Sequence, residues 1–548
     1  MSKHRLLSTV GAAALAVFGF PFAAAQAAAL TGVVSSAEEG AMEGVIVSAH
    51  KDGSNITVSV ISDDKGHYAF PADKLSPGKY AITIRAAGWE LDSAKSLDLA
   101  DAAATNDVKL KKTKNLAKQL TNAEWMASIP GTDDQKRDMI NCVSCHTLER
   151  IVRSSYDSDG FVAIQTRMSS YAQVSQPIKP QPRKEFSRSE DPEKRFRKMA
   201  DYLATINLSE SPTWNYELKT MPRVKGRGTH VVITEYDLPR KTIEPHDVIV
   251  FNGSVYYTNF GEQFLGKLDM TTGKPSEYEM KVFKPGWPTG NLDINPDKDG
   301  NLWMGMMYQA ALAKFDPKTE QFTYFPVSAE RNKDDTQLNM VTLHQDLDGK
   351  IWTNDAGSQG ILRLDVNTGK YEDLNPIAVL PGGKAQHSFY DIAPDASNNL
   401  FLTDFQSNTI MRVDAKDFST KTYQVATPVA RNRRGHMDAQ GRFWFAEFRG
   451  NNIGMLDTTT EKTTEFPMPT KFTSPYDVVW DKNGDLWTGG MTTDRVVRLD
   501  PKTGAAVEYP LPRDTNMRRV FVDNSTPIPT FWVGSNHGAS IVKVEPQD

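Results

Sequence analysis

Two thiols and an imidazole are the side chains of this sequence whose spacing points most directly to chemistry. Cys142 and Cys145 are the only cysteines among 548 residues, and His146 follows directly. In this spacing the thiols can form thioethers with the vinyl groups of a porphyrin while the imidazole binds the iron. A zinc site would need four ligands, and no second ligand pair follows at finger spacing; a redox dithiol would not require the histidine. The motif therefore predicts one covalently attached haem c, with His146 as an axial ligand of the iron.

A methionine sulfur is the sixth iron ligand that would best suit electron transfer, because it raises the reduction potential. Met168, Met199 and Met221 are available downstream of the motif. Each has an alternative role, since methionine also fills irregular gaps in apolar cores. We favour Met168, which falls on a predicted helix positioned to cover the open face of the haem. Met199, Met221 or an open sixth position remain alternatives.

The residues around the motif predict short helices that would position it. The pair Asp133-Asp134 can cap a helix that delivers Cys142, a second helix is predicted from residue 158, and a third begins at Asp191-Pro192. Three short helices around a Cys-x-x-Cys-His site resemble a class I-type cytochrome c domain, here over residues 113–225. The resemblance implies an electron-transfer module.

The N-terminus predicts export. Lys3 and Arg5 precede an apolar run over 6–22, and Ala25-Gln26-Ala27 provides the small residues of a cleavage site. The run is too short for a comfortable membrane span, so residues 1–27 are predicted to be a signal peptide and the mature chain periplasmic or secreted, not membrane-spanning. Bacteria attach haem c in the same compartment.

Short alternating runs separated by turn residues predict an antiparallel β-sandwich over residues 28–112. The stretch 62–70, the Leu75-Ser76-Pro77-Gly78-Lys79-Tyr80 turn region and residues 85–89 resemble a carboxypeptidase regulatory-like domain. The resemblance implies a transthyretin-like sandwich of the kind grouped with carbohydrate-binding-like folds.

Residues 226–548 repeat a four-strand unit, which predicts a β-propeller. An aromatic residue after a glycine turn recurs every 43 to 49 residues, at Tyr256, Trp303, Trp352, Phe401, Trp444, Trp487 and Trp532. These seven copies predict seven blades. The strand predicted over 229–239 has no blade before it and the last copy lacks an outer strand, so the two halves are expected to complete one blade and close the ring.

The segments Gly441–Glu447 and Asn451–Asp457, together with Glu244-Pro245-His246, resemble the streptogramin (virginiamycin B) lyase family. The resemblance implies an elimination in which a histidine removes a proton while a divalent metal near Glu-x-His stabilises the developing charge. Glu244 and His246 are therefore the candidate catalytic residues, with a divalent cation in the propeller. The neighbouring blades carry Leu292 and Arg518 where histidines would be needed, so the constellation is incomplete and enzymatic activity is left open.

The starts of the innermost strands predict a polar mouth around the central channel. Its candidate residues are Asp247, Asp293, Tyr390, Asp391, Arg433, Arg434, His436, Tyr476, Asp477, Arg518 and Arg519. Mixed charge there suits a polar, anionic or carbohydrate ligand. The alternative is a purely structural network, because inner-strand Asp and Arg also hold propeller blades together.

The sequence as a whole predicts a mostly β protein that transfers electrons. A net charge of -5 is small for 548 residues and indicates no nucleic-acid footprint. We expect an exported haem c protein whose propeller binds a polar substrate or a periplasmic redox partner, such as a dehydrogenase or another cytochrome. The alternative is a streptogramin B lyase-like or hydrolytic enzyme that acts in the propeller channel.

Overall fold

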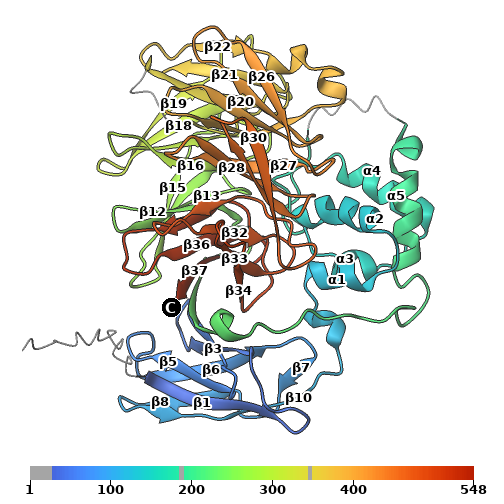
Figure 1. Cartoon of the computed structure of the whole chain (residues 1–548), viewed down its shortest axis with the longest axis vertical. Helices are drawn as coiled ribbons and strands as arrows, with labels where there is room; N and C mark the ends of the chain where they lie inside the picture. The colour runs from blue at the N-terminus through green and yellow to red at the C-terminus, as the bar shows by residue number, and fades with distance from the viewer. Residues whose placement is uncertain (1–27, 184–190, 343–347) are drawn as a thin grey trace, which may run out of the picture.

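An N-terminal β-sandwich, a helical segment and a C-terminal propeller make up the chain (Figure 1). The computed structural model describes residues 28–183, 191–342 and 348–548, so the predicted signal peptide lies outside the described residues. The fold is mostly β, as the alternating patterns predict.

The sandwich packs two sheets face to face. Its strands are β1 (Ala28–Ser36), β2 (Gly40–Ala41), β3 (Ile46–Lys51), β4 (Ile56–Ile61), β5 (His67–Pro71), β6 (Gly78–Arg85), β7 (Trp89–Leu91), β8 (Ser96–Leu99), β9 (Ala104–Thr105) and β10 (Val108–Lys112). One sheet has the order β2-β1-β10-β7, with β5 and β9 also paired to β1, and the other contains β4-β3-β6-β8. Alternate residues such as Val47, Phe70 and Tyr80 point inward and form one apolar core.

The helical segment follows the sandwich. It contains the 3₁₀ helix η1 (Leu116–Gln119), α1 (Asn122–Ser128), α2 (Asp133–Asp138), the 3₁₀ helix η2 (Met139–Ser144), α3 (Glu149–Val152), α4 (Ser158–Met168) and α5 (Pro192–Ile206). The predicted helices are present, but the side chain that caps α2 is Thr132, which forms a capping box with Gln135. Because Thr132 is the N-cap, Asp133 is the first residue inside the helix and does not cap it. Asp191 caps α5 and Pro192 is its first residue, as predicted.

The propeller is a series of antiparallel sheets. A 3₁₀ helix, η3 (Gly226–Thr229), leads into it. Its strands are β11 (Val231–Asp237), β12 (Pro245–Phe251), β13 (Ser254–Asn259), β14 (Phe264–Leu268), β15 (Pro275–Glu279), β16 (Leu292–Pro296), β17 (Leu302–Gly305), β18 (Ala311–Asp316), β19 (Gln321–Pro326), β20 (Lys350–Asp355), β21 (Gly360–Asp365), β22 (Tyr371–Leu374), β23 (Phe389–Pro394), β24 (Leu400–Asp404), β25 (Thr409–Val413), β26 (Thr420–Gln424), β27 (Asn432–Met437), β28 (Arg442–Glu447), β29 (Asn452–Asp457), β30 (Lys462–Pro467), β31 (Val479–Trp480), β32 (Leu486–Gly490), β33 (Arg495–Leu499), β34 (Ala506–Pro510), β35 (Val520–Asp523), β36 (Thr530–Ser535) and β37 (Ser540–Pro546). Two short 3₁₀ turns, η4 (Pro376–Val379) and η5 (Gly383–Ala385), follow β22. All seven aromatic anchors are buried; six lie on the second strand of their sheet, and Trp352 lies on β20, the first strand of the three-stranded sheet β20-β21-β22.

Strand β11 joins the two ends of the propeller and also joins the sandwich to it. It pairs antiparallel with β37, Val231 opposite Pro546, as expected from the two half-blades. Its other edge pairs antiparallel with β4, Val232 opposite Val60. One eight-stranded sheet, β35-β36-β37-β11-β4-β3-β6-β8, therefore runs from propeller to sandwich and leaves no free edge at β11.

The helices pack on one face of the propeller, beside the ring in Figure 1. A single apolar cluster combines helical residues such as Trp125 and Val143 with Phe448, Tyr476 and Met491 of the propeller. The backbone N–H of Ala123 also donates to the Thr492 carbonyl at 2.8 Å. The helices thus cover the end of the ring where the innermost strands begin.

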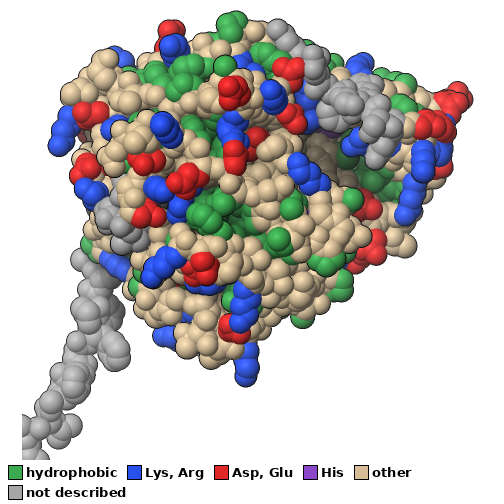
Figure 2. Space-filling view, turned by 90° about the horizontal axis from the view of Figure 1, so that it is seen from above, with side chains coloured by type: hydrophobic (Ala, Val, Ile, Leu, Met, Phe, Trp, Pro, Cys, Tyr) green, Lys and Arg blue, Asp and Glu red, His purple; other side chains and the backbone are tan. Residues whose placement is uncertain are grey.

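Charged side chains of both signs are mixed over the face seen in Figure 2. That pattern agrees with the small net charge of -5. Within the described ranges, no helix is long and apolar enough to cross a membrane.

Candidate functional site at the junction of helices and propeller

The Cys-x-x-Cys-His motif lies against the covered face of the propeller. Helix η2 carries Cys142 and ends just before Cys145. Two propeller side chains hold the backbone between the cysteines: Asn516 Nδ2 donates to the Val143 carbonyl at 2.9 Å, and Arg518 Nη2 donates to the Ser144 carbonyl at 2.8 Å. Arg518 Nε in turn donates to Asn516 Oδ1 at 2.9 Å. The propeller and the helices therefore build this site together.

Burial favours the neutral forms of all three side chains of the motif. Nδ1 of His146 lies 3.0 Å from the Thr147 carbonyl, which orients the ring and leaves Nε2 for a metal. Burial lowers the pKa of His146, so the neutral, ligating form is favoured. Burial raises the pKa of the Cys142 thiol to about 11 and also raises that of Cys145. A thioredoxin-like dithiol would need a lowered thiol pKa instead.

Several buried polar atoms beside the motif lack a hydrogen-bond partner among the described residues. Both amide atoms of Asn536 and Oε2 of Glu244 belong to this set. Burial lowers the pKa of His537, which lies beside them, to about 3, and a hydrogen bond with the Ser144 backbone opposes that effect. Buried polar groups are rarely left unpaired, because each costs about 1–3 kcal/mol. These atoms, together with the oriented His146, fit a group that is not part of the polypeptide, such as a haem.

The three candidate methionines differ in whether they contact the apolar cluster around Cys142. Met199 and Met221 pack against the same apolar cluster as Cys142. Met168 ends α4, is 39% exposed and is not part of that cluster. Which of them binds the iron stays a prediction.

A hydrogen-bonded chain of side chains runs from the covered mouth into the channel. The hydroxyls of Tyr390 and Tyr476 contact each other, and Tyr476 lies 3.3 Å from Nε2 of His246. Nδ1 of His246 lies 2.6 Å from Oδ2 of Asp247. A register irregularity of β12 between Pro245 and Val248 brings these adjacent side chains together. The arrangement resembles a general base with its orienting carboxylate.

Burial controls the charge of both candidate catalytic residues. It lowers the pKa of His246 to about 4, against the opposing effect of Asp247, so the imidazole is neutral at pH 7. It raises the pKa of Glu244 to about 8, with Arg518 opposing, so that carboxyl is mostly protonated at pH 7. The ring of His246 also stacks on Phe260 at 4.6 Å between centroids. A proton acceptor is therefore present, but Tyr476 covers it.

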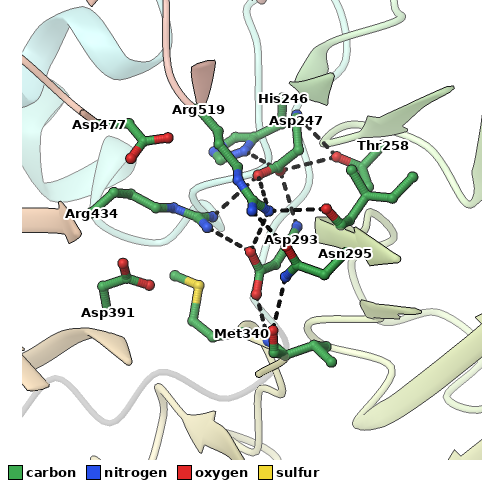
Figure 3. A network of polar contacts seen from close by, with 12 residues as sticks. His246, Asp247, Thr258, Asp293, Asn295, Met340, Asp391, Arg434, Asp477 and Arg519 are labelled. Carbon is green, nitrogen blue, oxygen red and sulfur yellow. Dashed lines mark hydrogen bonds and ion pairs between the residues drawn. The ribbon is translucent and has the colours of Figure 1, made fainter. Parts of the chain in front are cut away.

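The predicted mouth residues divide into two layers. The covered mouth holds Tyr390, Tyr476, His246, Arg518 and Arg433, whose guanidinium lies 3.9 Å from the ring centroid of Phe448. The channel below holds the residues one position further along these strands, namely Asp247, Asp293, Asp391, Arg434, Asp477 and Arg519, together with His436 (Figure 3). Successive residues of a strand point to opposite sides. Neighbouring residues such as Tyr476 and Asp477 therefore lie in different layers.

The channel aspartates link neighbouring sheets of the ring. Asp247 accepts from the Asp293 N–H at 3.0 Å, Asp391 from the Gly435 N–H at 2.8 Å, and Asp477 from the Val520 N–H at 3.1 Å. Arg434 and Arg519 both contact Asp293, at 2.7 and 2.6 Å (Figure 3). Most of this layer is therefore a structural network, one of the two alternatives that the sequence leaves open.

The expected divalent cation lacks a ligand set. Within residues 28–183, 191–342 and 348–548, no three His, Cys, Asp or Glu side chains are grouped to hold a metal ion. Cys142, Cys145 and His146 thus do not converge on one point, as a zinc site requires. Because Glu244 and His246 supply only two donors, we derive no step through a divalent metal.

Sequence reasoning missed Asn516 and the Asn536-His537 turn. Asn516 lies two residues before the strand start at Arg518, and Asn536-His537 follows the last aromatic anchor, Trp532. A search of the turns at the same end of the ring as the strand starts would have found them, because both turns face the covered mouth.

Comparisons with known proteins agree with two of the three resemblances. A model of the virginiamycin B lyase family matches residues 376–548, and a model of the carboxypeptidase regulatory-like domain matches residues 29–111. Among solved structures, selenomethionine-substituted virginiamycin B lyase from Staphylococcus aureus is 20% identical, with a TM-score of 0.49, and the match covers 57% of this chain and 98% of that chain. A catalytically inactive variant of that lyase with quinupristin is 21% identical, with the same TM-score of 0.49 and the same 57% and 98% coverage. No curated protein matches this chain.

The matches confirm a propeller similar to virginiamycin B lyase and a carboxypeptidase regulatory-like sandwich. They do not cover the helical segment between them. Its resemblance to a c-type cytochrome remains a prediction.

Proposed function

We propose that this chain is an exported haem c protein that transfers electrons at the junction of its helices and its propeller. Cys142 and Cys145 would hold the haem covalently, and His146 would bind the iron. The bound haem would supply a one-electron redox centre. The chain would work in the periplasm or outside the cell, with a dehydrogenase or another cytochrome as its redox partner.

The observation that carries this proposal is the contact between the attachment turn and the propeller. Asn516 and Arg518 hold the two carbonyls between the cysteines at 2.9 and 2.8 Å, and within the described residues both amide atoms of the buried Asn536 have no hydrogen-bond partner. A loop without a ligand would not need a rigid backbone and orphaned polar atoms at the same place. The thioether edge of the haem would therefore face the propeller mouth.

The propeller in this proposal has seven blades. Six sheets lie between β12 and β34, and β35, β36 and β37 with β11 would form the seventh. Met168 is kept as the proposed sixth iron ligand, with Met199, Met221 and an open position as alternatives. A polar or carbohydrate ligand of the sandwich belongs to the same set of proposals.

Covalent haem is tested by expressing the full chain in a bacterium with a haem c maturation system. The purified protein should retain a haem stain on a denaturing gel and show reducible Soret and α bands. The double variant Cys142→Ala/Cys145→Ala should lose the stain. Ser144→Ala is the matched control, since it keeps both thiols and His146. If the wild type carries no covalent haem, the proposal fails.

The second candidate is an elimination or hydrolysis at His246, which the propeller's similarity to virginiamycin B lyase favours. His246 with Asp247 behind it at 2.6 Å has the geometry of an oriented base. Tyr476→Phe would remove the hydroxyl that covers Nε2 and His246→Ala would remove the base. If the wild type opens cyclic depsipeptides, His246→Ala should abolish that activity; full activity in His246→Ala would refute the assignment.

A further inference from the structure

A cavity lies in the channel, at the end away from the helices. Its volume is about 430 Å³, within the range of small-molecule sites. The lining comes from the later residues of the innermost strands, among them Pro296, His436, Trp480 and Phe521. Pro296 is exposed and the two rings are half-buried, so the cavity reaches the surface. The haem motif lies at the opposite end, where the strands begin.

One carboxyl in this cavity has no ion pair. Among the described residues, no Lys, Arg or His side chain lies within ion-pair distance of Asp391, although it is buried with 5% exposed. Its Oδ2 accepts from the Gly435 N–H at 2.8 Å, and no hydrogen bond to its Oδ1 is formed within the same residues. Figure 3 shows Asp391 apart from the bonded network, with no dashed line to the residues drawn.

The arginines nearby are already engaged with other aspartates. Arg434 contacts Asp293 at 2.7 Å and Asp247 at 3.4 Å, and Arg519 contacts the same two carboxylates at 2.6 and 3.5 Å. Four aspartates, Asp247, Asp293, Asp391 and Asp477, therefore share two guanidiniums in this layer. The excess of carboxylate favours a cation over an anion in the cavity.

A second acceptor and two aromatic rings complete the cavity. Nε2 of His436 lies 2.9 Å from Oδ1 of Asp477, so in the neutral ring Nε2 carries the proton and Nδ1 is an acceptor. Trp480 and Phe521 also line the cavity, and aromatic rings of this kind attract cations. Burial raises the pKa of Asp391 to about 6, an effect that Arg434 opposes and Asp293 reinforces, so the carboxyl is mostly ionised at pH 7.

We propose that this cavity binds a small organic ammonium ion, with Asp391 and His436 accepting from its N–H groups and Trp480 or Phe521 packing on its apolar part. An inorganic divalent ion fits less well, because no three carboxylate, Cys or His groups of the described residues are arranged to hold one. The inference does not depend on haem at the other end of the channel.

The test uses calorimetric titration of the full-length protein at pH 7 with benzylammonium, benzyl alcohol and benzoate, which share a ring and differ in charge. Benzylammonium should bind saturably and the other two should not. Asp391→Asn keeps an acceptor for the Gly435 N–H and should weaken binding about tenfold or more. Asp417→Asn, on the exposed outer hairpin, is the matched control and should bind as the wild type does.

Each other outcome overturns the proposal. These are no binding of benzylammonium, equal binding of benzyl alcohol or benzoate, unchanged affinity in Asp391→Asn, or full displacement by calcium chloride. If Asp391→Asn does not fold, His436→Ala decides, because its side chain is 29% exposed and it should also weaken binding. Unchanged affinity in a folded His436→Ala variant refutes the proposal, whether or not the protein carries haem.

Discussion

Replacing Arg518 with methionine should loosen the attachment turn without unfolding the propeller. The side chain donates to the Ser144 carbonyl at 2.8 Å and to Asn516 Oδ1 at 2.9 Å, and its guanidinium lies 4.7 Å from the Phe260 centroid. A charged hydrogen bond is worth about 1.5–3 kcal/mol and the cation–π contact about 0.5–2 kcal/mol. Since methionine keeps much of the apolar stem, we expect a loss of about 3 kcal/mol.

The loss should appear as local opening of the turn. A change of about 3 kcal/mol raises an opening constant by about 150-fold. Hydrogen exchange measured by mass spectrometry on peptides covering 139–152 should therefore speed up by that order in Arg518→Met, while peptides from β23–β26 stay unchanged.

Arg513→Met is the matched control for this substitution. Arg513 lies five residues earlier and pairs with Glu235 and Asp237, at 2.9 and 2.7 Å, on the side of the blade that faces the sandwich. Its loss should leave exchange over 139–152 as in the wild type. Equal protection of this turn in wild type and Arg518→Met would refute the reasoning that the propeller holds it, and equal loss in both variants would show a general destabilisation instead.

Two further predictions concern buried carboxyls. Asp477 accepts hydrogen bonds from the Val478 and Val520 N–H groups and from His436, at 2.8, 3.1 and 2.9 Å. Asp477→Ala removes this acceptor and should lower the free energy of unfolding in urea by about 3–5 kcal/mol. The exposed Asp417→Ala is the control and should change that free energy little. Burial raises the pKa of Asp477, but His436, Arg519 and Arg434 outweigh it and lower that pKa, so this contribution is present above the unfolded pKa and is lost as pH falls through the folded one. The pH dependence that Glu244 contributes has the opposite sign. Burial raises its pKa to about 8, so the folded state keeps a proton that the unfolded state releases. The contribution of Glu244 to the free energy of unfolding therefore falls by about 1.4 kcal/mol per pH unit between about pH 5 and 8. Glu244→Gln should remove that slope in urea unfolding at pH 5 and pH 8, whereas the exposed Glu279→Gln should keep it; an unchanged slope in Glu244→Gln would contradict the burial argument.

Local chemistry in the sequence was enough to predict the elements of this fold. The spacing of Cys142, Cys145 and His146, the alternation of the sandwich strands and the recurring aromatic anchors are properties of short segments. Helix α5 was predictable for the same reason, since Asp191 and Pro192 act on their own first turn. The capping residue of α2 was assigned one position late, because Thr132 and Asp133 are both good caps and only the reciprocal bonds with Gln135 distinguish them.

The site needed the tertiary structure, because its partners are far apart along the chain. Asn516 and Val143 are 373 residues apart, and no local pattern links them. Asp477 and the Val520 N–H are also far apart in the sequence. Their hydrogen bond shows that Asp477, which the sequence predicted as a ligand-binding residue, joins two neighbouring sheets. An aspartate at a strand start looks the same in the sequence whether its carboxylate faces a ligand or a neighbouring backbone N–H group.

The sequence by itself determined the three segments of this chain, and it predicted the chemistry that they could carry. Only the tertiary structure decided that the helices cover the end of the ring where Glu244 and His246 lie, and that β4 continues the sheet of β11. The physical reason is that covalent attachment, capping and strand alternation act between near neighbours. Docking depends instead on which polar and apolar groups of distant segments complement each other after folding.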